Sequence, residues 1–217
     1  MDKTLQTYYS RRAQEYESIY HRNDPLRQSE LESIRQTVTK YFVGKRVLEI
    51  ACGTGYWTEA VAPVAQQITA TDFSLDMLQV AQNKPALQTQ VDFKQADAYE
   101  LDTIRGAFDA GLANFWFSHI PKARISQFLR GFHKRLEPGA LVFMCDNLYV
   151  PGVGGELIQK SNSEDTFKLR TLSYGSNYEI LKNYFTREEL QAIFEPHSTE
   201  LTITIGQCFW WIQYHVA

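Results

Sequence analysis

Residues 47 to 57 read Val-Leu-Glu-Ile-Ala-Cys-Gly-Thr-Gly-Tyr-Trp, a short apolar run containing one acid and followed by two glycines one residue apart. The apolar run is typical of a buried parallel strand, which lacks the alternation of a half-exposed strand. Gly53 and Gly55 allow a tight turn and a close backbone approach to a ligand, because glycine has no Cβ and tolerates positive φ. The residues after Gly55 predict a helix. Strand, glycine loop and helix together make half of a nucleotide-binding βαβ unit.

Two residues of this unit bear on which nucleotide it binds. A dinucleotide fingerprint has a small residue three positions after Gly55, where this chain has Thr58. Thr58 therefore argues against a nicotinamide-dependent oxidoreductase, which ranks third among the functions that the sequence allows. Glu49 lies at the end of the strand, where its carboxylate could attract a cationic ligand. S-adenosylmethionine, with an ammonium and a sulfonium group, is such a ligand.

The stretch resembles motif I of the class I S-adenosylmethionine-dependent methyltransferases, in which two apolar residues, an acid and an apolar residue precede Gly-x-Gly-x-Gly. Glu49, Gly53 and Gly55 match this motif, and Ala51 replaces its first glycine. The resemblance implies that the loop backbone holds the methionine part of the cofactor, with Glu49 assisting. A lone Gly-x-Gly also occurs as a purely structural turn.

Acidic residues end the next two predicted strands as well. Asp72 follows a strand over 67–71, and Asp97 follows a strand over 91–96. A carboxylate at Asp72, about 20 residues beyond the glycine loop, can accept hydrogen bonds from both ribose hydroxyls. The resemblance implies that Asp97 accepts from the adenine amino group and that the amide of Ala98 contacts the ring. Each acid alone could be an ordinary cap, but three in order at successive strand ends predict a cofactor site. The remaining predicted cofactor-binding residues are Phe73, Met77, Asn114 and Tyr16.

The composition is that of one α/β enzyme domain with a large core. The 217 residues are 44% hydrophobic and 13% aromatic. A formal net charge of −3 gives no electrostatic footprint for nucleic acid or an anionic membrane. No apolar segment has the length of a signal peptide or a membrane span. The three scattered cysteines look like reduced core thiols. We therefore expect a cytoplasmic protein, monomeric or homodimeric, with no nucleic-acid or membrane partner.

The rest of the pattern predicts a single domain over residues 1–217. The family's fold implies an α/β three-layer sandwich with a seven-stranded, mostly parallel sheet whose last strand is antiparallel. Two segments lie outside this scheme, namely an N-terminal lid helix within 1–25 and an inserted substrate-cap segment over 148–185, after strand five. Two alternating runs around a glycine turn predict a β-hairpin in this insertion, over 166–184. The other expected elements are helices over 26–42 and 122–136, strands over 107–113, 140–145, 201–205 and 208–216, and a capping box at Thr186 to Glu189.

The end of the fourth strand lies beside the transferred methyl group in the resembled fold. This places residues 114–119, Asn-Phe-Trp-Phe-Ser-His, next to the chemistry. His119 is the candidate general base, because its pKa is normally near neutrality, although it could equally cap a helix or bond a backbone carbonyl. Asn114 is the second catalytic candidate. Trp116 and Phe117 would form an aromatic wall for the acceptor, or belong to the core.

Asp146 and Asn147 close the fifth strand, where catechol-type methyltransferases have an Asp-Asn pair that helps to hold magnesium. Those enzymes also have an Asp at the end of strand four, which this chain lacks, so we expect no metal. The pair could orient a polar acceptor or cap the strand. Arg170, with two lysines of the hairpin, would give that hairpin a basic face, either for an acidic acceptor or as solvated surface. The predicted substrate-binding residues are Tyr9, Trp116, Phe117, His119, Asp146, Asn147 and Arg170.

Together these features predict an enzyme that moves a methyl group from S-adenosylmethionine to a nitrogen or oxygen of a small molecule, leaving S-adenosylhomocysteine, by in-line displacement. The alternative is a regulatory protein that binds either form of the cofactor without turnover, since it would carry the same cofactor motifs. The identity of the acceptor and the atom methylated stay open at this point.

Overall fold

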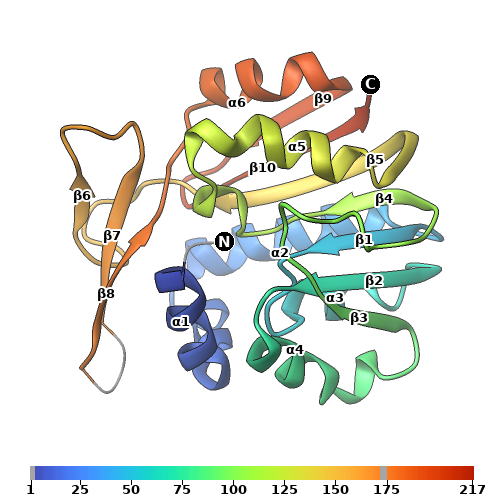
Figure 1. The fold of residues 1–217 in the computed structure, drawn as a ribbon, viewed down its shortest axis with the longest axis horizontal. Coiled ribbons are helices and arrows are strands. Elements are labelled where there is room, and N and C mark those ends of the chain that lie inside the picture. Colours follow the sequence, from blue (N-terminus) through green and yellow to red (C-terminus); the bar gives the residue numbers. More distant parts are fainter. Residues whose placement is uncertain (1–2, 172–174) are drawn as a thin grey trace.

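A seven-stranded sheet forms the centre of the computed structural model, which describes residues 3–171 and 175–217 (Figure 1). The strand order is β3-β2-β1-β4-β5-β10-β9. β10 is antiparallel to both of its neighbours, whereas the pairs from β3 to β5 are parallel. The predicted sheet, mostly parallel with an antiparallel last strand, is confirmed. Its strands are β1 (Arg46–Ile50), β2 (Gln67–Asp72), β3 (Val91–Gln95), β4 (Phe108–Leu112), β5 (Leu136–Asn147), β9 (Ser198–Ile205) and β10 (Phe209–Val216).

Helices cover both faces of this sheet, which gives the predicted three layers (Figure 1). Val47 of β1 packs into the apolar cluster on one face, and Leu48 and Ile50 pack into the cluster on the other. Burial on both faces explains why consecutive residues of β1, such as Val47 and Leu48, are apolar. The first cluster includes side chains of α2 (Pro25–Tyr41), α3 (Tyr56–Val61) and α4 (Leu75–Gln82), and the second those of α5 (Ile125–His133) and α6 (Arg187–Phe194). Short 3-10 turns are η2 (Pro85–Leu87), η3 (Phe117–His119), η4 (Lys122–Arg124) and η5 (Glu195–His197).

The boundary between α5 and β5 differs from the prediction. The helix expected over 122–136 begins as the turn η4 and ends at His133, and β5 already begins at Leu136. Residues 137–139, Glu-Pro-Gly, therefore lie within the strand instead of ending the helix. Pro138 is tolerated there because the register of β4 against β5 shifts at this point, and a bulge needs no hydrogen bond from every amide. The predicted capping box of α6 is confirmed, with Thr186 and Glu189 bonding each other's backbone amides.

The N-terminal segment is not the single helix expected. It consists of α1 (Lys3–Arg12) followed by the 3-10 helix η1 (Ala13–Tyr20). The change of helix type leaves Tyr9, Tyr16 and Tyr20 in a chain of ring contacts, with centroids 5.7 and 6.1 Å apart. The segment lies near the carboxyl ends of the parallel strands, at the left of Figure 1. It is therefore placed where a lid over that edge would be.

The insertion after β5 forms a second sheet of three antiparallel strands in the order β6-β7-β8. We call this the cap sheet. β7 and β8 are the two predicted arms of the hairpin, and the predicted turn residues Ser173 and Tyr174 lie outside the described residues. β6 was not predicted, because three residues are too few to show an alternating pattern. The strands are β6 (Leu157–Gln159), β7 (Thr166–Thr171) and β8 (Asn177–Leu181).

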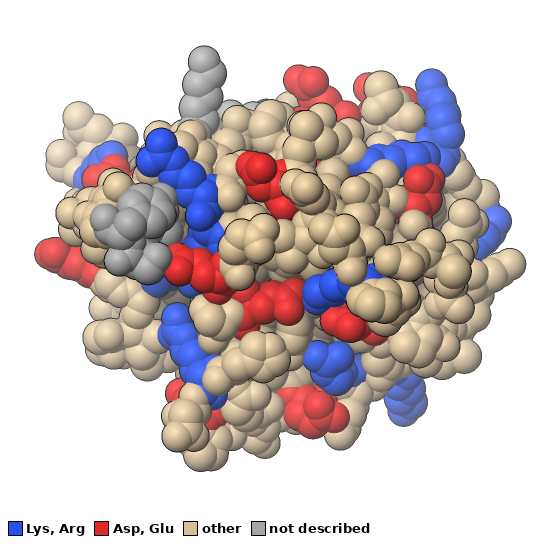
Figure 2. Space-filling model, turned by 90° about the horizontal axis from the view of Figure 1, so that it is seen from below, with Lys and Arg blue, Asp and Glu red and all other residues tan. Residues whose placement is uncertain are grey.

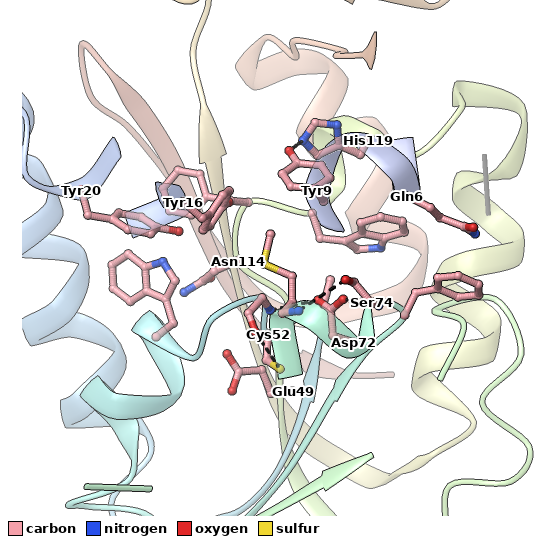
Figure 3. Close-up of a pocket in the computed structure, with 17 residues that line it drawn as sticks. Gln6, Tyr9, Tyr16, Tyr20, Glu49, Cys52, Asp72, Ser74, Asn114 and His119 are labelled. Atoms are coloured by element: carbon pink, nitrogen blue, oxygen red, sulfur yellow. Dashed lines mark hydrogen bonds between the residues drawn. The ribbon is translucent and has the colours of Figure 1, made fainter. Parts of the chain in front are cut away.

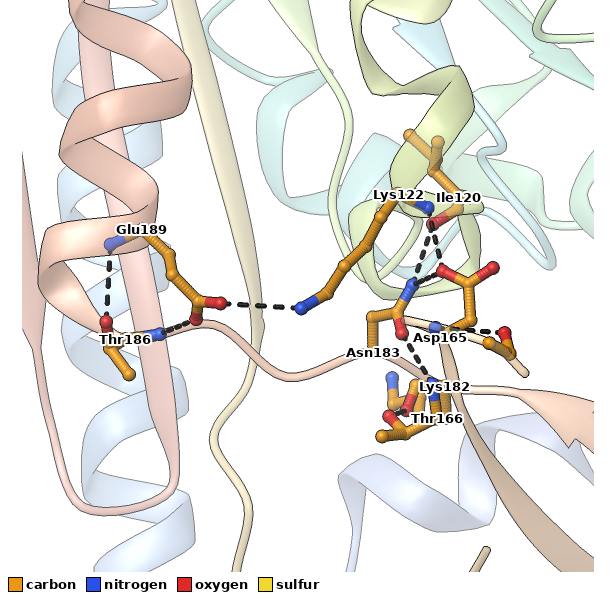
Figure 4. A network of polar contacts seen from close by, with 9 residues as sticks. Ile120, Lys122, Asp165, Thr166, Lys182, Asn183, Thr186 and Glu189 are labelled. Atoms are coloured by element: carbon orange, nitrogen blue, oxygen red, sulfur yellow. Dashed lines mark hydrogen bonds and ion pairs between the residues drawn. The ribbon is translucent and has the colours of Figure 1, made fainter. Parts of the chain in front are cut away.

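A buried asparagine fixes the cap sheet to the main domain (Figure 4). The side-chain oxygen of Asn183 accepts from the amide of Thr166 at 2.9 Å. Its Nδ2 donates to the carbonyl of Ile120 at 3.0 Å and to Asp165 Oδ1 at 2.8 Å. Asp165 Oδ1 also accepts from the amide of Lys122 at 2.8 Å. Because both side-chain groups of Asn183 are bonded, the cap sheet is held in one position relative to the turn before α5.

The cysteines, the helices and the surface charges of the structure bear on what the composition predicts. The three cysteines are buried and free of disulfides, as predicted for core thiols. Within the described residues, no helix combines the length and the apolar character needed to cross a bilayer. On the face drawn in Figure 2, basic and acidic side chains are interspersed and do not gather into a patch of one sign. This distribution agrees with the small net charge.

Candidate functional site

A cavity, called here the first cavity, lies where the glycine loop, the carboxyl ends of β2 and β4 and the N-terminal segment meet (Figure 3). Such an edge is where open parallel sheets bind ligands. Three predicted cofactor-binding residues, Gly55, Asp97 and Ala98, do not line it. The predicted residues that do are Glu49, Ala51, Gly53, Asp72, Phe73, Met77, Asn114 and Tyr16.

The three residues outside the lining have structural contacts nearby. Gly55 has a φ of +80°, and a Cβ there would meet side-chain atoms of Leu87 and Ala81 at 3.0 and 3.1 Å, so it lets the loop pack against α4. Asp97 Oδ1 accepts from the amide of Tyr99 at 2.9 Å, and Ala98 is buried. The contact of the Asp97–Ala98 pair with adenine therefore stays a prediction.

Asp72 holds the glycine loop in place. Its Oδ2 accepts from the amide of Gly53 at 2.9 Å, and its Oδ1 from that of Ser74 at 2.8 Å. Burial raises the pKa of Asp72 to about 6, and these amide bonds oppose the rise. The loop also contains Ala51 at a φ of +53°, where the family motif has glycine. A left-handed alanine costs roughly 1 kcal/mol, so the loop conformation is maintained against a small strain.

Glu49 is a buried carboxylate on the wall of the first cavity (Figure 3). Its side chain is hydrogen-bonded to the hydroxyl of Thr58, at 2.7 Å, and among the described residues it has no ion pair with a cation. Burial raises the pKa of Glu49 to about 7, against the bond from Thr58, and the nearby charge of Asp72 adds to the rise. An ionised carboxylate in such a place is stabilised when a cationic group binds beside it.

Side-chain donors of residues that line the first cavity, among them Asn114 and Trp116, also lack partners. Asn114 Oδ1 accepts from the amide of Cys145 at 3.1 Å, but its Nδ2 is buried without a hydrogen bond. The indole N–H of Trp116, which also lines the first cavity, is likewise buried and unbonded. Buried polar groups normally have partners, so unpaired donors beside a cavity indicate a ligand with acceptor atoms.

A second cavity adjoins the first and lies between the N-terminal segment, the end of β5 and the cap sheet. The two cavities share part of their wall, because Tyr9, Tyr16, Phe115 and His119 line both. Phe115 has a φ of +57°, which is rare for a bulky residue and marks a constrained turn after β4. Two adjoining cavities with a common wall can hold two reactants side by side.

His119 and Tyr9 form a hydrogen-bonded pair on this common wall (Figure 3). His119 Nδ1 lies 2.7 Å from the carbonyl of Leu181, so this nitrogen carries the proton and donates. The other ring nitrogen, Nε2, then accepts from the Tyr9 hydroxyl at 2.8 Å. Burial, followed by the positive charge of Lys182, lowers the pKa of His119 to about 3. The imidazole is therefore neutral at physiological pH and its lone pair is used by Tyr9.

The predicted substrate-binding residues divide into two groups. Arg170 and Asn147 line the second cavity, Trp116 the first, and Tyr9 and His119 both. Phe117 and Asp146 line neither, and both are fully buried.

Phe117 and Asp146 have roles behind the cavity walls instead. Phe117 packs in the core against Phe185 and Phe194, with ring centroids 5.1 Å apart in each case. Asp146 accepts from Lys182 Nζ at 2.9 Å. Alternation along a strand shows that two faces exist, and it does not show which of them meets a ligand.

The basic face expected on the cap sheet also differs from the prediction. Lys168 is buried, and its ammonium donates to the carbonyl of Gly155 at 2.7 Å, so it tethers the glycine-rich loop before β6. Lys182 is buried in its ion pair with Asp146. Arg170, the third basic residue expected there, lines the second cavity and forms no ion pair in the described part of the chain.

Several residues of the site were missed from the sequence. Tyr20 and Trp57 line the first cavity, and Arg12, Arg22 and Arg27 line the second. Each looks in the sequence like an ordinary packing aromatic or a solvated arginine. Apart from Trp57, which ends the glycine-loop stretch, no motif or spacing distinguishes them, since they come from separate segments that only the fold brings together.

Known proteins resemble this chain in sequence and in fold. Residues 47–139 match a family model described as a methyltransferase domain. A demethylmenaquinone methyltransferase of Clavibacter sepedonicus is 33% identical over 144 residues, which cover 64% of this chain and 57% of that protein. The demethylmenaquinone methyltransferase of Staphylococcus aureus strain JH9 is 28% identical over 176 residues, which cover 70% of this chain and 66% of that protein. The chain thus spans less than two thirds of the length of these curated relatives.

The fold of the whole chain is also found among solved structures. The DhpI–SAH complex matches with a TM-score of 0.80 and 23% identity, over 99% of this chain and 96% of that one. The region matched by the family model begins at Val47 and contains the glycine loop, Asp72 and Asp97. Residues 47–139 are thus similar to a methyltransferase domain, and the chain as a whole shares the fold of the DhpI–SAH complex.

Proposed function

We propose that the protein transfers a methyl group from S-adenosylmethionine, bound in the first cavity, to a small molecule bound in the second. The observation that carries this proposal is Glu49, a buried carboxylate with no cation beside it in the described residues, on the wall of a cavity that adjoins another. The relatives named as methyltransferases and the neighbour solved with SAH support it.

The residues of the first cavity fit this cofactor. Glu49 would hold its ammonium group, and the unpaired Nδ2 of Asn114 would donate to an acceptor atom of the ligand. Asp72 has lone pairs left for the ribose hydroxyls, while Met77 and Phe73 supply an apolar wall for the adenine. The cofactor supplies a methyl group activated by its positively charged sulfur. The protein therefore has mainly to align the acceptor and exclude water.

His119 acts in this proposal through Tyr9. A group with a pKa of about 3 is a weak base at neutral pH, because proton transfer is most effective when the pKa is near the working pH. The Tyr9 hydroxyl is fixed by Nε2 of His119 at the wall between the two cavities. We infer that His119 is a positioning residue and that Tyr9 orients the acceptor.

Replacing His119 by Ala is expected to lower kcat by about 10- to 100-fold without changing the Kd of S-adenosylmethionine, because Tyr9 loses its partner. Tyr9→Phe should give a similar loss, and the double variant should lose little more, since the two residues act as one unit. His133→Ala is the matched control, because His133 forms the same kind of bond to Tyr214, at 2.8 Å, outside both cavities.

The pH profile separates this role from general-base catalysis. The wild-type kcat should not fall between pH 8 and pH 6 through His119, whose titration lies far below this window. A fall with an apparent pKa near 6.5 that disappears in His119→Ala would show that His119 takes the proton itself.

The proposed function is tested by binding first and turnover second. Calorimetric titration of the purified protein should show saturable micromolar binding of S-adenosylmethionine and S-adenosylhomocysteine, and none of NAD. Isotopically labelled methyl donor should then label components of a small-molecule extract. Binding without any labelled product would favour the regulatory alternative, and binding of NAD alone would overturn the assignment of the first cavity.

A further inference from the structure

The second cavity is lined by cations from separate parts of the chain. Arg12 ends α1, Arg22 precedes α2, Arg27 belongs to α2 and Arg170 to β7. Lys182, just after β8, is the fifth. Within the described residues no Asp or Glu lines this cavity.

The charges of the four arginines are not neutralised in the part of the chain that the structure describes. None of the four forms an ion pair there, whereas Arg46, outside the site, pairs with both Asp109 and Glu137. The Nε atoms of Arg27 and Arg170 are buried and have no hydrogen-bond partner. Buried N–H groups of this kind are costly unless a ligand accepts from them.

The contacts that hold these side chains are with neutral groups. Arg12 donates to the hydroxyl of Tyr8 at 2.8 Å, and Arg27 donates to Asn147 Oδ1 at 3.3 Å and lies 4.4 Å from the ring centre of Phe209. Stacking on an aromatic face leaves the N–H edge of a guanidinium available. The arginines are thus positioned by neutral groups, and none of the four forms an ion pair with a carboxylate in the described residues.

The cluster repels itself, as its pKa values show. Partial burial lowers the pKa of Arg22, and the charges of Arg170 and Arg12 lower it further. Burial also lowers the pKa of Arg27, with the charge of Arg22 as the next cause. An anion in the cavity would relieve this repulsion and supply acceptors for the unpaired N–H groups at the same time.

We propose that the methyl acceptor is a small molecule carrying an oxyanion, a carboxylate or phosphoryl group, which the arginines of the second cavity hold. This inference names the acceptor class of the function proposed above and rests on it. The planar fork of Arg170, Arg27 or Arg22 matches two oxygens of such a group. A protonated amine is excluded by the same charges. Because Tyr9 and His119 line both cavities, an acceptor anchored here extends toward the first.

Binding of simple anions tests the site directly. The protein saturated with S-adenosylhomocysteine should bind inorganic phosphate, followed by calorimetry at low ionic strength, and should not bind tetramethylammonium. Arg170→Gln should weaken phosphate binding at least tenfold, and Arg22→Gln several-fold. Arg22→Gln keeps the test valid if Arg170→Gln fails to fold, because Arg22 is exposed. Arg130→Gln, an exposed position on α5, is the matched control and should bind phosphate as the wild type does.

Turnover gives the second readout. The components of a metabolite extract that accept labelled methyl should be retained on an anion exchanger, and Arg170→Gln should lose their methylation while its Kd for S-adenosylmethionine stays that of the wild type. Acceptors found only in the unretained fraction, or phosphate binding that is equal in Arg22→Gln, Arg170→Gln and Arg130→Gln, would overturn the inference. Failure to bind S-adenosylmethionine at all would instead overturn the proposed function, so the two failures are distinguishable.

Discussion

Replacing Glu49 by Gln is expected to weaken binding of S-adenosylmethionine by about 10- to 100-fold, since a hydrogen bond to a charged group is worth roughly 1.5 to 3 kcal/mol. The same change should make the ligand-free protein more stable. Burial raises the pKa of Glu49 from 4.5 to about 7, so above pH 7 the folded protein bears the cost of a buried charge. A shift of this size corresponds to roughly 3 kcal/mol. The stabilising effect of Glu49→Gln at pH 8 should therefore reach that order.

The pH dependence follows from the sign of this shift. Between 4.5 and about 7 the folded state keeps a proton that the unfolded state has lost, so the contribution of Glu49 to stability is present below pH 4.5 and lost as pH rises to 7. The stability gained by Glu49→Gln should shrink accordingly as the pH falls from 8 to 5. The affinity of the wild type for S-adenosylmethionine should rise from pH 5 to pH 8, as Glu49 ionises. The affinity of the variant should depend less on pH.

Urea unfolding of the ligand-free protein and calorimetric titration, each at pH 5 and pH 8, measure these effects. Glu100→Gln is the control, because Glu100 is exposed and lies outside both cavities. Equal cofactor affinity in Glu49→Gln and the wild type at pH 8 would show that Glu49 does not hold the ammonium group.

Replacing Asp146 by Asn is expected to destabilise the protein by about 3 to 5 kcal/mol, the usual cost of removing one partner of a buried ion pair. Lys182 Nζ lies 2.9 Å from Asp146 Oδ1, and their side chains are 5% and 0% exposed. Burial is the largest influence on the pKa of Asp146 and acts to raise it. The opposing contributions, led by the charge of Lys182 and including hydrogen bonds from the amides of Ser118 and Asn147, together hold the pKa below its usual value, so the carboxylate is ionised. The pKa of Lys182 is lowered too, because burial outweighs the attraction of Asp146. Without the carboxylate, the buried ammonium has no compensating charge.

A double replacement distinguishes the ion pair from simple packing. Asp146→Asn combined with Lys182→Met should recover most of the stability lost in Asp146→Asn, because neither charge is then buried. Glu179→Gln is the control. Glu179, on the cap sheet, pairs with Lys160 at the surface, where such pairs contribute less than about 1 kcal/mol. Urea unfolding of the four proteins measures the differences. A loss in Asp146→Asn no larger than that in Glu179→Gln would contradict the assigned role.

The first cavity could be predicted in large part from the sequence because its signals are local. Glu49, Gly53 and Asp72 sit at or just after the ends of consecutive strands, and the carboxyl ends of parallel strands meet at one edge of a sheet. The structure brings these three residues into one cavity. The errors at this level were small, such as the start of β5, where a bulge lets a proline enter a strand.

The second cavity could not be predicted in the same way. Lys168 and Arg170 alternate with Phe167 and Leu169 along β7, and that pattern alone does not show which face is covered. In the fold, Lys168 is buried against the carbonyl of Gly155, and Arg170 faces the second cavity. Charged residues are usually exposed to solvent, so the sequence alone favours solvent-exposed positions for Lys168 and Arg170.

The sequence by itself determined the class of fold and most of the residues that meet at the first cavity, because strand patterns, glycine loops and strand-end acids act over a few residues. Only the tertiary structure decided the character of the second cavity. Arg12, Arg22, Arg27 and Arg170 are far apart along the chain and carry no shared motif. Their charges become a single basic cavity only when the N-terminal segment and the cap sheet pack over the same edge of the sheet. Electrostatic interactions depend on distance in space, which separation along the chain does not reveal.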